Sequence, residues 1–277
     1  MKFTKMEGCG NDYVYVDCTV TALENPGEIS KKVSDRHYGI GSDGLILIKK
    51  SDKADFFMEM YNSDGSQSQM CGNGIRCVGK YVYDNRLTDK TEVSIDTLAG
   101  IKYLKLNVKD GYVTDVTVDM GRPELEAKKV PVVADEEKVI AKKVNIGGTE
   151  YSMTCVSMGN PHAIVFVDSV KDIDIEKTGP LFENDSMFPE RTNTEFIEIV
   201  DRKTLKMRVW ERGAGETLAC GTGACAALVA AVLNGYADEE ASLILLGGTL
   251  HIKWDRKEDK VYMQGPATTV FTGEINL

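Results

Sequence analysis

The stretch M-C-G-N-G-I-R-C, from Met70 to Cys77, decides how the rest of this chain is interpreted. It places a cysteine directly before a Gly-Asn-Gly turn and a helix-like run. A second stretch, A-C-G-T-G-A-C-A at residues 219–226, repeats the pattern, and Cys220 lies 149 residues after Cys71. The chain is therefore expected to contain the same unit of turn, cysteine and helix twice.

The same offset holds upstream of each cysteine. F-F-M-E-M-Y-N at 56–62 aligns with L-K-M-R-V-W-E at 205–211, and in both stretches apolar residues occupy every second position. Alternation with a period of two is typical of a strand with one buried face. A strand is therefore predicted to precede the Gly-rich turn in both halves.

Further markers extend the repeat to within a few residues. N-D-Y-V-Y-V-D ends at Asp17 and N-P-H-A-I-V-F-V-D ends at Asp168, while T-V-D-M-G-R-P at 117–123 resembles V-Y-M-Q-G-P at 261–266. An internal duplication is the simplest interpretation. We expect an N-terminal domain of residues 1–119 plus 266–277 with Cys71, and a C-terminal domain of residues 120–265 with Cys220. The active site is expected in the cleft between them.

Most predicted elements are strands, because short β-branched runs alternate with Asp-Gly and Ala-Gly turn signals. Helices are predicted near residues 27–37, 74–85, 171–183 and 222–234. The last contains A-C-A-A-L-V-A-A-V-L-N-G, which is apolar nearly all round and should be buried, with Asn234-Gly235 as its C-terminal signal. The predicted fold class is α+β, with two pseudo-symmetric domains of like topology, each a curved, mainly antiparallel sheet around a central helix.

Length and composition limit the possible functions. The 277 residues are 42% hydrophobic and 27% charged, as in ordinary globular proteins, and the net charge of −10 argues against nucleic acid or an anionic membrane as the main partner. No apolar run approaches the length of a membrane helix, and the N-terminus lacks an apolar signal core. We expect a cytoplasmic protein whose ligand is a small molecule.

The seven cysteines do not fit a disulfide framework or a zinc site. Their number is odd, and Cys71 with Cys77 and Cys220 with Cys225 form C-x5-C and C-x4-C pairs rather than the tight C-x2-C of structural zinc sites. Cys77 and Cys225 do not align in the repeat, so packing is the better interpretation for both, and we predict no metal. Packing is also predicted for Cys9, Cys18 and Cys155.

A second motif, G-I-G-S-D-G at 39–44, matches the spacing of a dinucleotide fingerprint but not its context. A helix-like run precedes it and a strand-like run follows, whereas the fingerprint requires strand first and helix second. A turn with glycines at positive φ is the better interpretation, and no nucleotide cofactor is predicted.

Cys71 and Cys220 each stand where a Gly-rich turn opens a helix. Backbone N–H groups at 72–74 and 221–223 should point out of the helix ends, where they attract anions and lower the pKa of a nearby thiol from about 8.5. Two such units predict a carboxylate cradle with a sulfur on each face of the adjacent carbon. One thiolate would remove an α-proton and the opposite thiol would return one, inverting the centre without a cofactor.

At these motifs the sequence resembles the diaminopimelate epimerases, pyridoxal-independent enzymes that interconvert the LL and meso forms of 2,6-diaminoheptanedioate. The resemblance covers nearly the whole chain, through K-M-E-G-C-G-N-D-Y-V-Y-V-D, G-I-G-S-D-G-L-I, Y-N-S-D-G-S-Q-S-Q-M-C-G-N-G-I-R-C, G-N-P-H-A-I-V-F-V-D, R-T-N-T-E-F-I-E-I-V and V-W-E-R-G-A-G-E-T-L-A-C-G-T-G-A-C-A. It implies that Cys71 and Cys220 are the acid/base pair and that His162 and Glu211 help set their protonation. The substrate-binding residues that it implies are Asn11, Asn62, Gly72, Asn73, Asn160, Asn193, Glu211, Arg212, Gly221 and Thr222.

The resemblance has one departure and leaves alternatives open. Some family members have glutamine where this chain has Gly44, so no side-chain contact with substrate is expected there. The family also implies a homodimer and a role in lysine and peptidoglycan precursor synthesis. The rival hypotheses are a proline or hydroxyproline racemase of the same architecture, and a redox-sensing binding protein in which Cys71 and Cys220 form a switchable disulfide.

Overall fold

The computed structural model describes all residues, 1–277, and the chain divides into two units. Unit 1 comprises Met1–Asp119 and Gln264–Leu277, and unit 2 comprises Met120–Met263. Two strands, β8 (Tyr112–Gly121) and β17 (Lys260–Pro266), carry the chain from one unit to the other. None of the helices is both long and apolar enough to span a membrane.

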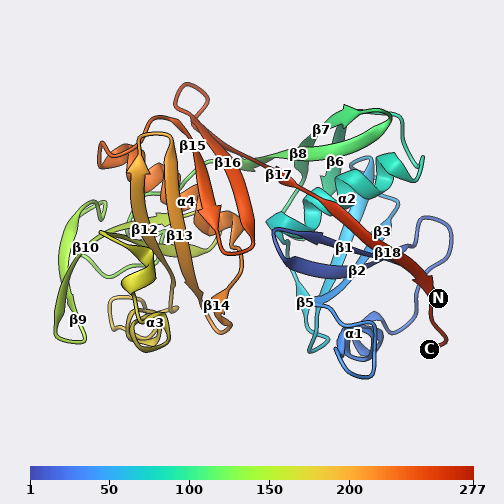
Figure 1. Ribbon diagram of the computed structural model, residues 1–277, viewed down its shortest axis with the longest axis horizontal. Helices are drawn as coiled ribbons and strands as arrows, with labels where there is room; N and C mark the ends of the chain where they lie inside the picture. The colour runs from blue at the N-terminus through green and yellow to red at the C-terminus, as the bar shows by residue number, and fades with distance from the viewer. The chain divides into compact units, whose positions relative to one another are not determined.

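Unit 1 is a curved sheet with one helix enclosed by its strands and a shorter helix outside (Figure 1). The enclosed helix is α2 (Gly72–Asp84), which packs against β1, β2 and β7, and the shorter one is α1 (Pro26–Ser34). Most strand pairs are antiparallel, but β2–β3 and β4–β6 are parallel. The remaining strands of unit 1 are β1 (Lys2–Gly8), β2 (Asn11–Asp17), β3 (Gly44–Lys49), β4 (Phe56–Asn62), β5 (Gln67–Ser68), β6 (Glu92–Asp96), β7 (Lys102–Lys109) and β18 (Thr268–Glu274).

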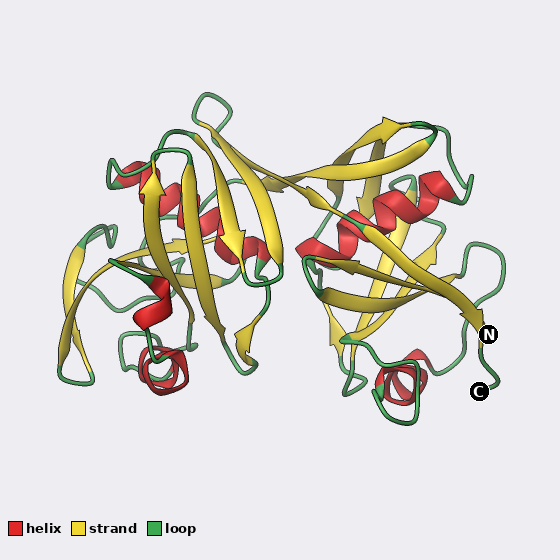
Figure 2. Cartoon of the chain, viewed as in Figure 1, coloured by secondary structure: helices red, strands yellow, loops and turns green.

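Unit 2 repeats this arrangement, as the helices and strands of Figure 2 show. Its enclosed helix is α4 (Gly221–Leu233), which packs against β10, β11, β12, β15 and β16, and its outer helix is α3 (Ile175–Glu183). The other elements are β9 (Lys142–Ile146), β10 (Thr149–Ser157), β11 (Pro161–Val167), the 3-10 turn η1 (Val170–Asp172), β12 (Asn193–Asp201), β13 (Thr204–Glu211), β14 (Gly215–Thr217), β15 (Glu240–Leu245) and β16 (Gly248–Asp255). Two like units, each a mainly antiparallel sheet around a helix, confirm the predicted fold class.

The 149-residue offset extends to the bounds and register of individual elements. Helix α4 begins and ends 149 residues after α2, and α3 stands in the same relation to α1. In the parallel pair β2–β3, Tyr13 lies opposite Gly44, and in the parallel pair β11–β12, His162 lies opposite Asn193, again 149 residues later. Positions 149 residues apart therefore occupy equivalent places in the two units.

Two helices differ from the sequence-based prediction, and local hydrogen bonds explain both differences. The first ends at Ser34 instead of continuing to 37, because the Asp35 carboxylate accepts the N–H groups of His37 and Tyr38 at 2.7 and 2.8 Å and stabilises a tight turn. The predicted helix 171–183 is split into η1 and α3, since the Asp174 side chain caps a new helix through the Lys177 N–H. The predicted burial of α4 is confirmed.

Candidate active site: two cysteine-capped helices

Each repeated cysteine is the N-cap residue of the enclosed helix of its unit. Cys71 and Cys220 have extended backbone conformations, and their sulfurs accept the N–H groups of Gly74 and Gly223 at 3.3 and 3.4 Å. The sequence had placed three outward-pointing amides at each turn, but the third bonds to the cysteine itself. The amides that point out of the helix ends are thus those of the first two residues, Gly72 with Asn73 and Gly221 with Thr222.

The third residue of each helix must be small because the sheet passes directly beneath it. A Cβ on Gly74 would lie 2.8 Å from the Cδ1 atom of Ile46. A Cβ on Gly223 would collide with Oε1 of Glu195 and lie 3.0 Å from its Cδ. The two helix ends therefore rest on chemically different side chains at equivalent positions.

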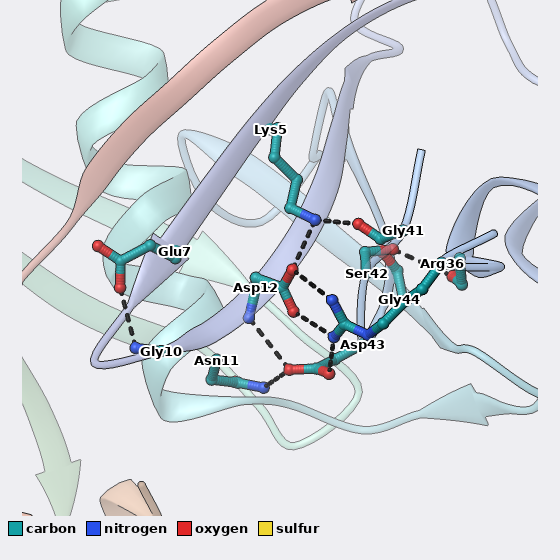
Figure 3. Close-up of polar contacts among 11 residues, drawn as sticks. Lys5, Glu7, Gly10, Asn11, Asp12, Arg36, Gly41, Ser42, Asp43 and Gly44 are labelled. Atoms are coloured by element: carbon teal, nitrogen blue, oxygen red, sulfur yellow. Dashed lines mark hydrogen bonds and ion pairs between the residues drawn. The ribbon is translucent and has the colours of Figure 1, made fainter. Parts of the chain in front are cut away.

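In unit 1, a chain of hydrogen bonds orients the partner of Cys71. The half-buried Cys71 donates its thiol proton to Oδ1 of Asn11, with 3.0 Å between sulfur and oxygen. The Nδ2 group of Asn11 donates to Oδ2 of Asp43 at 2.7 Å, and Arg36 donates to Oδ1 of Asp43 at 2.9 Å (Figure 3). Because Asp43 accepts the amide hydrogens, the carbonyl oxygen of Asn11 is the atom left to face the sulfur.

Tyr13 is a neighbour of Cys71 that sequence reasoning missed. Its buried side chain forms hydrogen bonds with Asn11 and Cys71, and burial, followed by the charges of Cys71 and Asp43, raises the Tyr13 pKa far above its usual value. A Cβ on Gly44 would lie 2.9 Å from Cε1 of Tyr13 and would collide with the Tyr61 carbonyl. The pairing of Tyr13 with Gly44 in the sheet register was the available signal.

Behind this site, a charged cluster joins the first strands to the loop before β3. The buried Lys5 forms an ion pair with Asp12 at 2.5 Å and also bonds the Gly41 carbonyl, while Arg36 reaches Asp12 at 2.8 Å (Figure 3). Burial opposes ionisation of Asp12, but hydrogen bonds from Arg36 and Lys5 outweigh it and lower the Asp12 pKa. The cluster fixes the backbone that carries Asn11.

In unit 2, a buried histidine is bonded at both ring nitrogens. His162 Nδ1 lies 2.7 Å from Oε1 of Glu195, and its Nε2 lies 3.0 Å from Oδ1 of Asn160. His162 and Glu195 have no exposed side-chain surface. Ligand atoms of His162, Glu195 and Cys220 all lie within 4.8 Å of one another, so the pair stands directly beside the sulfur.

This trio also contains residue types that bind metals, which the cysteine spacings alone did not reveal. The three side chains, His, Glu and Cys, are all buried. However, the Nδ1–Oε1 contact at 2.7 Å is a hydrogen bond that a metal ion would have to break. The arrangement as it stands is suited to holding and moving protons.

Cys220 differs from the expectation that a helix end lowers the thiol pKa. Burial raises the Cys220 pKa well above its usual value, and the nearby carboxylates of Glu211 and Glu195 raise it further. Hydrogen bonds from Thr222 and the Gly223 amide oppose the shift but are outweighed. The expectation was wrong because it counted the helix amides and left out the burial of the sulfur and the two acids, so Cys220 rests as the protonated thiol.

Glu211 is held close to Cys220 at the end of β13. Its Oε1 accepts the Thr217 hydroxyl at 2.5 Å, and its carboxyl group also bonds with Cys220. Burial raises the Glu211 pKa despite these hydrogen bonds, and the charge of Glu195 adds to the effect. The end of β13 therefore contributes a second proton-holding group to this half-site.

Several of the other candidate residues form hydrogen bonds within their own unit, and Asn193 and Arg212 bond to each other. In unit 2, Asn193 bonds the Pro161 carbonyl and accepts the Arg212 N–H at 2.9 Å, while the Arg212 guanidinium bonds the Glu190 carbonyl. In unit 1, the Asn73 side chain accepts from Arg76. The Asn62 amide donates to the Ser66 hydroxyl at 3.0 Å.

The remaining cysteines pack in the interior, as predicted. Cys77 and Cys155 are buried, and burial raises the pKa of each to about 12. Cys9 and Cys18 are also buried with raised pKa values, and Cys225 lies within the buried face of α4. None of the seven forms a disulfide. Only Cys71 and Cys220 cap helices.

Comparison with known proteins first defines the fold. A PhzF-family phenazine biosynthesis protein from Bacillus anthracis has a TM-score of 0.72 at 17% identity, covering 100% of this chain and 99% of that one. A hydroxyproline epimerase from Agrobacterium vitis has a TM-score of 0.68 at 13% identity, covering 99% of this chain and 90% of that one. The chain thus has the two-domain fold that these proteins share.

The sequence comparisons then define the family. The model of the family Diaminopimelate epimerase matches residues 3–126 and 154–270. A diaminopimelate epimerase from Methanococcus maripaludis is 59% identical over the full length of both chains. This chain belongs to the diaminopimelate epimerase family.

Proposed function

We propose that the protein epimerises LL-2,6-diaminoheptanedioate to the meso form without a cofactor, through removal and return of an α-proton. One observation carries the proposal: two equivalent helices each begin at a cysteine whose following amides point outward. The family to which the chain belongs supports the choice of reaction and substrate. By the same support, we place the reaction in lysine and peptidoglycan precursor synthesis.

In the proposed reaction, both cysteines act on one α-carbon. A Cys71 or Cys220 thiolate takes the α-proton, and the electrons of the C–H bond remain on the carbon next to the carboxylate. The other cysteine delivers its S–H proton to the opposite face, and the electrons of the S–H bond remain on its sulfur. The stereocentre is inverted, and the two sulfurs have exchanged protonation states.

The helix ends stabilise the charge that develops in this reaction. We propose that the amides of Gly72, Asn73, Gly221 and Thr222 bind the carboxylate at the reacting carbon. Backbone donors at helix N-termini favour a negative charge and need no reorganisation as the charge grows. They supply the electrostatic stabilisation that a weakly acidic α-proton requires.

The second end of the substrate carries an additional carboxylate and amine. We propose that Arg212 offers a forked donor to that carboxylate, while Asn62, Asn160 and Asn193 serve both groups. Asn11 accepts a hydrogen bond from Cys71, and we propose that it belongs to the same substrate-binding set. A site that hydrogen-bonds these groups rejects substrates that lack them, because its polar atoms are then left unpaired.

His162 and Glu211 set the protonation of the sulfurs in this proposal. Glu211 is bonded to Cys220 and holds a proton readily, since burial raises its pKa. His162 lies beside Cys220 with both ring nitrogens bonded. We further propose a cytoplasmic homodimer, which the family resemblance supports and sedimentation analysis would test.

Proton exchange is the direct test. The reduced protein is incubated with the LL isomer in deuterated water, and the α-proton is followed by NMR. We expect loss of the α-proton signal together with formation of the meso isomer. A folded, reduced sample that gives neither would overturn the proposal.

The same assay separates the rival functions. The fold shared with a hydroxyproline epimerase favours testing L-proline and trans-4-hydroxy-L-proline as substrates. Exchange on those substrates, and not on the diamino diacid, would assign the rival isomerase. A redox sensor would instead join Cys71 to Cys220 on oxidation and never exchange a substrate proton.

A further inference from the structure

Glu195 occupies a position that the fold fills with an apolar residue in the other unit. It lies on β12 beneath Gly223 of α4, and the equivalent residue 149 positions earlier is Ile46, on β3 beneath Gly74 of α2. Both side chains are fully buried. Since the same backbone packs around isoleucine in unit 1, the fold does not itself require a carboxylate at this place.

Burial of the Glu195 carboxylate at this position also lowers the stability of the folded protein. Only Oε1 of Glu195 has a partner, His162, while Oε2 is buried without a hydrogen-bond partner in the protein. A buried acid with an unsatisfied oxygen loses solvation that one ion pair repays only in part, and apolar replacements of such pairs are often neutral or stabilising. A buried carboxylate that lowers the stability of the fold in this way indicates a role in catalysis and not in holding the fold together.

The hydrogen-bond partner of Glu195 also differs from the equivalent residue of the other unit. His162 is equivalent to Tyr13, so unit 2 has a His–Glu pair where unit 1 has Tyr and Ile. Oε1 of Glu195 accepts from Nδ1 of His162, and the amide oxygen of Asn160, also an acceptor, lies 3.0 Å from Nε2. Both ring nitrogens are therefore anchored, and the ring is held in one orientation beside Cys220.

We propose that Glu195 is a positioning residue for proton transfer at Cys220: it anchors His162 through Nδ1 and places a negative charge beside the sulfur, so that the resting half-site of unit 2 keeps its proton. This inference rests on the proposed function for its catalytic meaning. Its physical content, a Cys220 thiol held protonated by Glu195, can be measured without any substrate.

Each element packed around Cys220 carries groups that shift the equilibrium between its thiol and its thiolate. Glu211 on β13 and Glu195 on β12 both oppose a thiolate, and His162 on β11 lies beside Glu195. On α4, the Thr222 hydroxyl and the Gly223 amide favour the thiolate. Burial itself opposes the thiolate most strongly and is unchanged in a Glu195 variant. Removing the charge of Glu195 takes away one of the two acids that add to this effect, so the thiolate should form at lower pH.

The test compares Glu195→Gln, which keeps the shape and removes the charge, with Glu195→Ile, which installs the unit 1 residue. The matched control is Glu198→Gln, on the same strand but paired with Lys206 and away from the sulfur. Alkylation of Cys220 by iodoacetamide is followed against pH, with each cysteine peptide quantified by mass spectrometry. We expect the Cys220 profile to move about one unit lower in Glu195→Gln, a tenfold gain in thiolate at a given pH.

Turnover and stability complete the test. In Glu195→Gln we expect kcat to fall about 10- to 100-fold, the usual scale for a residue that orients a ligand or base, with KM little changed. The thermal midpoint of Glu195→Ile should equal or exceed that of the parent. Glu198→Gln should leave the alkylation profile and kcat unchanged.

Each result can be separated from failure of the proposed function. A parent protein that exchanges no substrate proton would overturn the function but leave the alkylation test standing. An unchanged Cys220 profile in Glu195→Gln would overturn the inference, even if turnover fell. A thermal midpoint lowered by many degrees in both variants would likewise overturn it, because it would assign Glu195 to stability.

Discussion

The two cysteine-capped helix ends share a backbone and differ in nearly every side chain around the sulfur. Cys71 is half-buried and faces the amide of Asn11, whereas Cys220 is buried between Glu211 and Glu195. At equivalent positions, unit 1 has Tyr13 and Ile46 where unit 2 has His162 and Glu195. In unit 1 the charged side chains form the cluster of Lys5, Asp12, Arg36 and Asp43. In unit 2 the buried pair of His162 and Glu195 lies beneath the helix.

This contrast shows that the two properties of each helix end, the placement of its backbone amides and the acidity of its thiol, depend on different parts of the structure. Outward-pointing amides depend on the backbone, so both units keep the extended cysteine followed by glycine at the first and third helix positions. Thiol acidity depends on neighbouring charges, and these can change without altering the fold. A duplicated scaffold can therefore carry two cysteines of unequal acidity, as the proposed reaction requires.

The largest expected effect is the loss of either sulfur. Cys71→Ser and Cys220→Ser should each lower kcat by about 10²- to 10⁴-fold, because a hydroxyl is a far weaker acid than a thiol and is hardly ever ionised to act as a base, while the proposed reaction has each group move a proton. The measurement is the NMR exchange rate in deuterated water. Despite their different burial, both variants should fail, since one turnover of the proposed reaction uses both sulfurs.

Cys77→Ser is the matched control, because Cys77 lies in the same helix but packs in the core. It should lose some stability and retain most of its turnover. Near-normal exchange in Cys71→Ser or in Cys220→Ser would contradict the two-base scheme and make the contrast between the half-sites irrelevant to catalysis.

The second effect concerns the glycines beneath the helix ends. In Gly74→Ala, the new methyl group meets the flexible tip of Ile46 at 2.8 Å, and the helix gains from the better propensity of alanine, so stability should change by less than about 1 kcal/mol. In Gly223→Ala, the methyl group collides with the Glu195 carboxylate, and overpacking should cost about 1–3 kcal/mol.

Thermal unfolding and kcat measured on both variants test this difference. Displacement of Glu195 should also lower the kcat of Gly223→Ala, by about the same factor as Glu195→Gln. Equal losses in the two alanine variants would mean that both helix ends rest on equally adaptable neighbours, and that Ile46 and Glu195 do not differ in this respect.

The sequence was sufficient for the duplication, the fold class and the placement of both cysteines. The exact offset between Cys71 and Cys220 and the period-two strands made the repeat visible, because strand alternation and Gly-rich helix starts leave local signals. The predicted helices were found with shifted ends, since side-chain caps such as Asp35 and Asp174 compete with helix continuation.

The environment of the sulfurs could not be predicted in the same way. Nothing near Cys220 in the sequence shows that Glu195 lies within 4.8 Å, because the two are joined only through the packing of β12 against α4. Applying the 149-residue offset to every position would have exposed Glu195, as a carboxylate aligned with Ile46. It would also have aligned Tyr13 with His162.

A smaller effect should follow from removing the Tyr13 hydroxyl. Tyr13→Phe loses hydrogen bonds with Asn11 and Cys71, and a hydrogen bond to a group that becomes charged contributes about 1.5 kcal/mol, equivalent to roughly tenfold in kcat. Tyr15→Phe is the control. Tyr15 lies two residues after Tyr13 on the same strand, and its hydroxyl donates to the Gly74 carbonyl. Turnover of Tyr15→Phe should remain near that of the parent, and an equal loss in both would remove any special role for Tyr13.

The smallest effect lies in the charged cluster that only unit 1 has. Lys5, Asp12, Arg36 and Asp43 correspond to Thr154, Pro161, Asp185 and Thr192 in unit 2. Because Arg36 and Lys5 lower the folded Asp12 pKa, the pairing contributes stability above the unfolded value near 3.9, and this is lost as the pH falls through the lower folded value. Arg36 is 57% exposed, so its share should be about 0.5 kcal/mol.

Arg36→Gln should therefore be less stable than the parent by about 0.5 kcal/mol at pH 7, and the difference should shrink towards zero as the pH falls below the unfolded value near 3.9. Urea unfolding across this pH range measures it, with Arg202→Gln as a control because Arg202 is equally exposed and pairs with Asp238 in unit 2. A difference that stays constant with pH would mean that Arg36 acts through packing alone. In that case the charge on Asp12 would not distinguish the two units, and the contrast between them would reduce to Glu195 and His162.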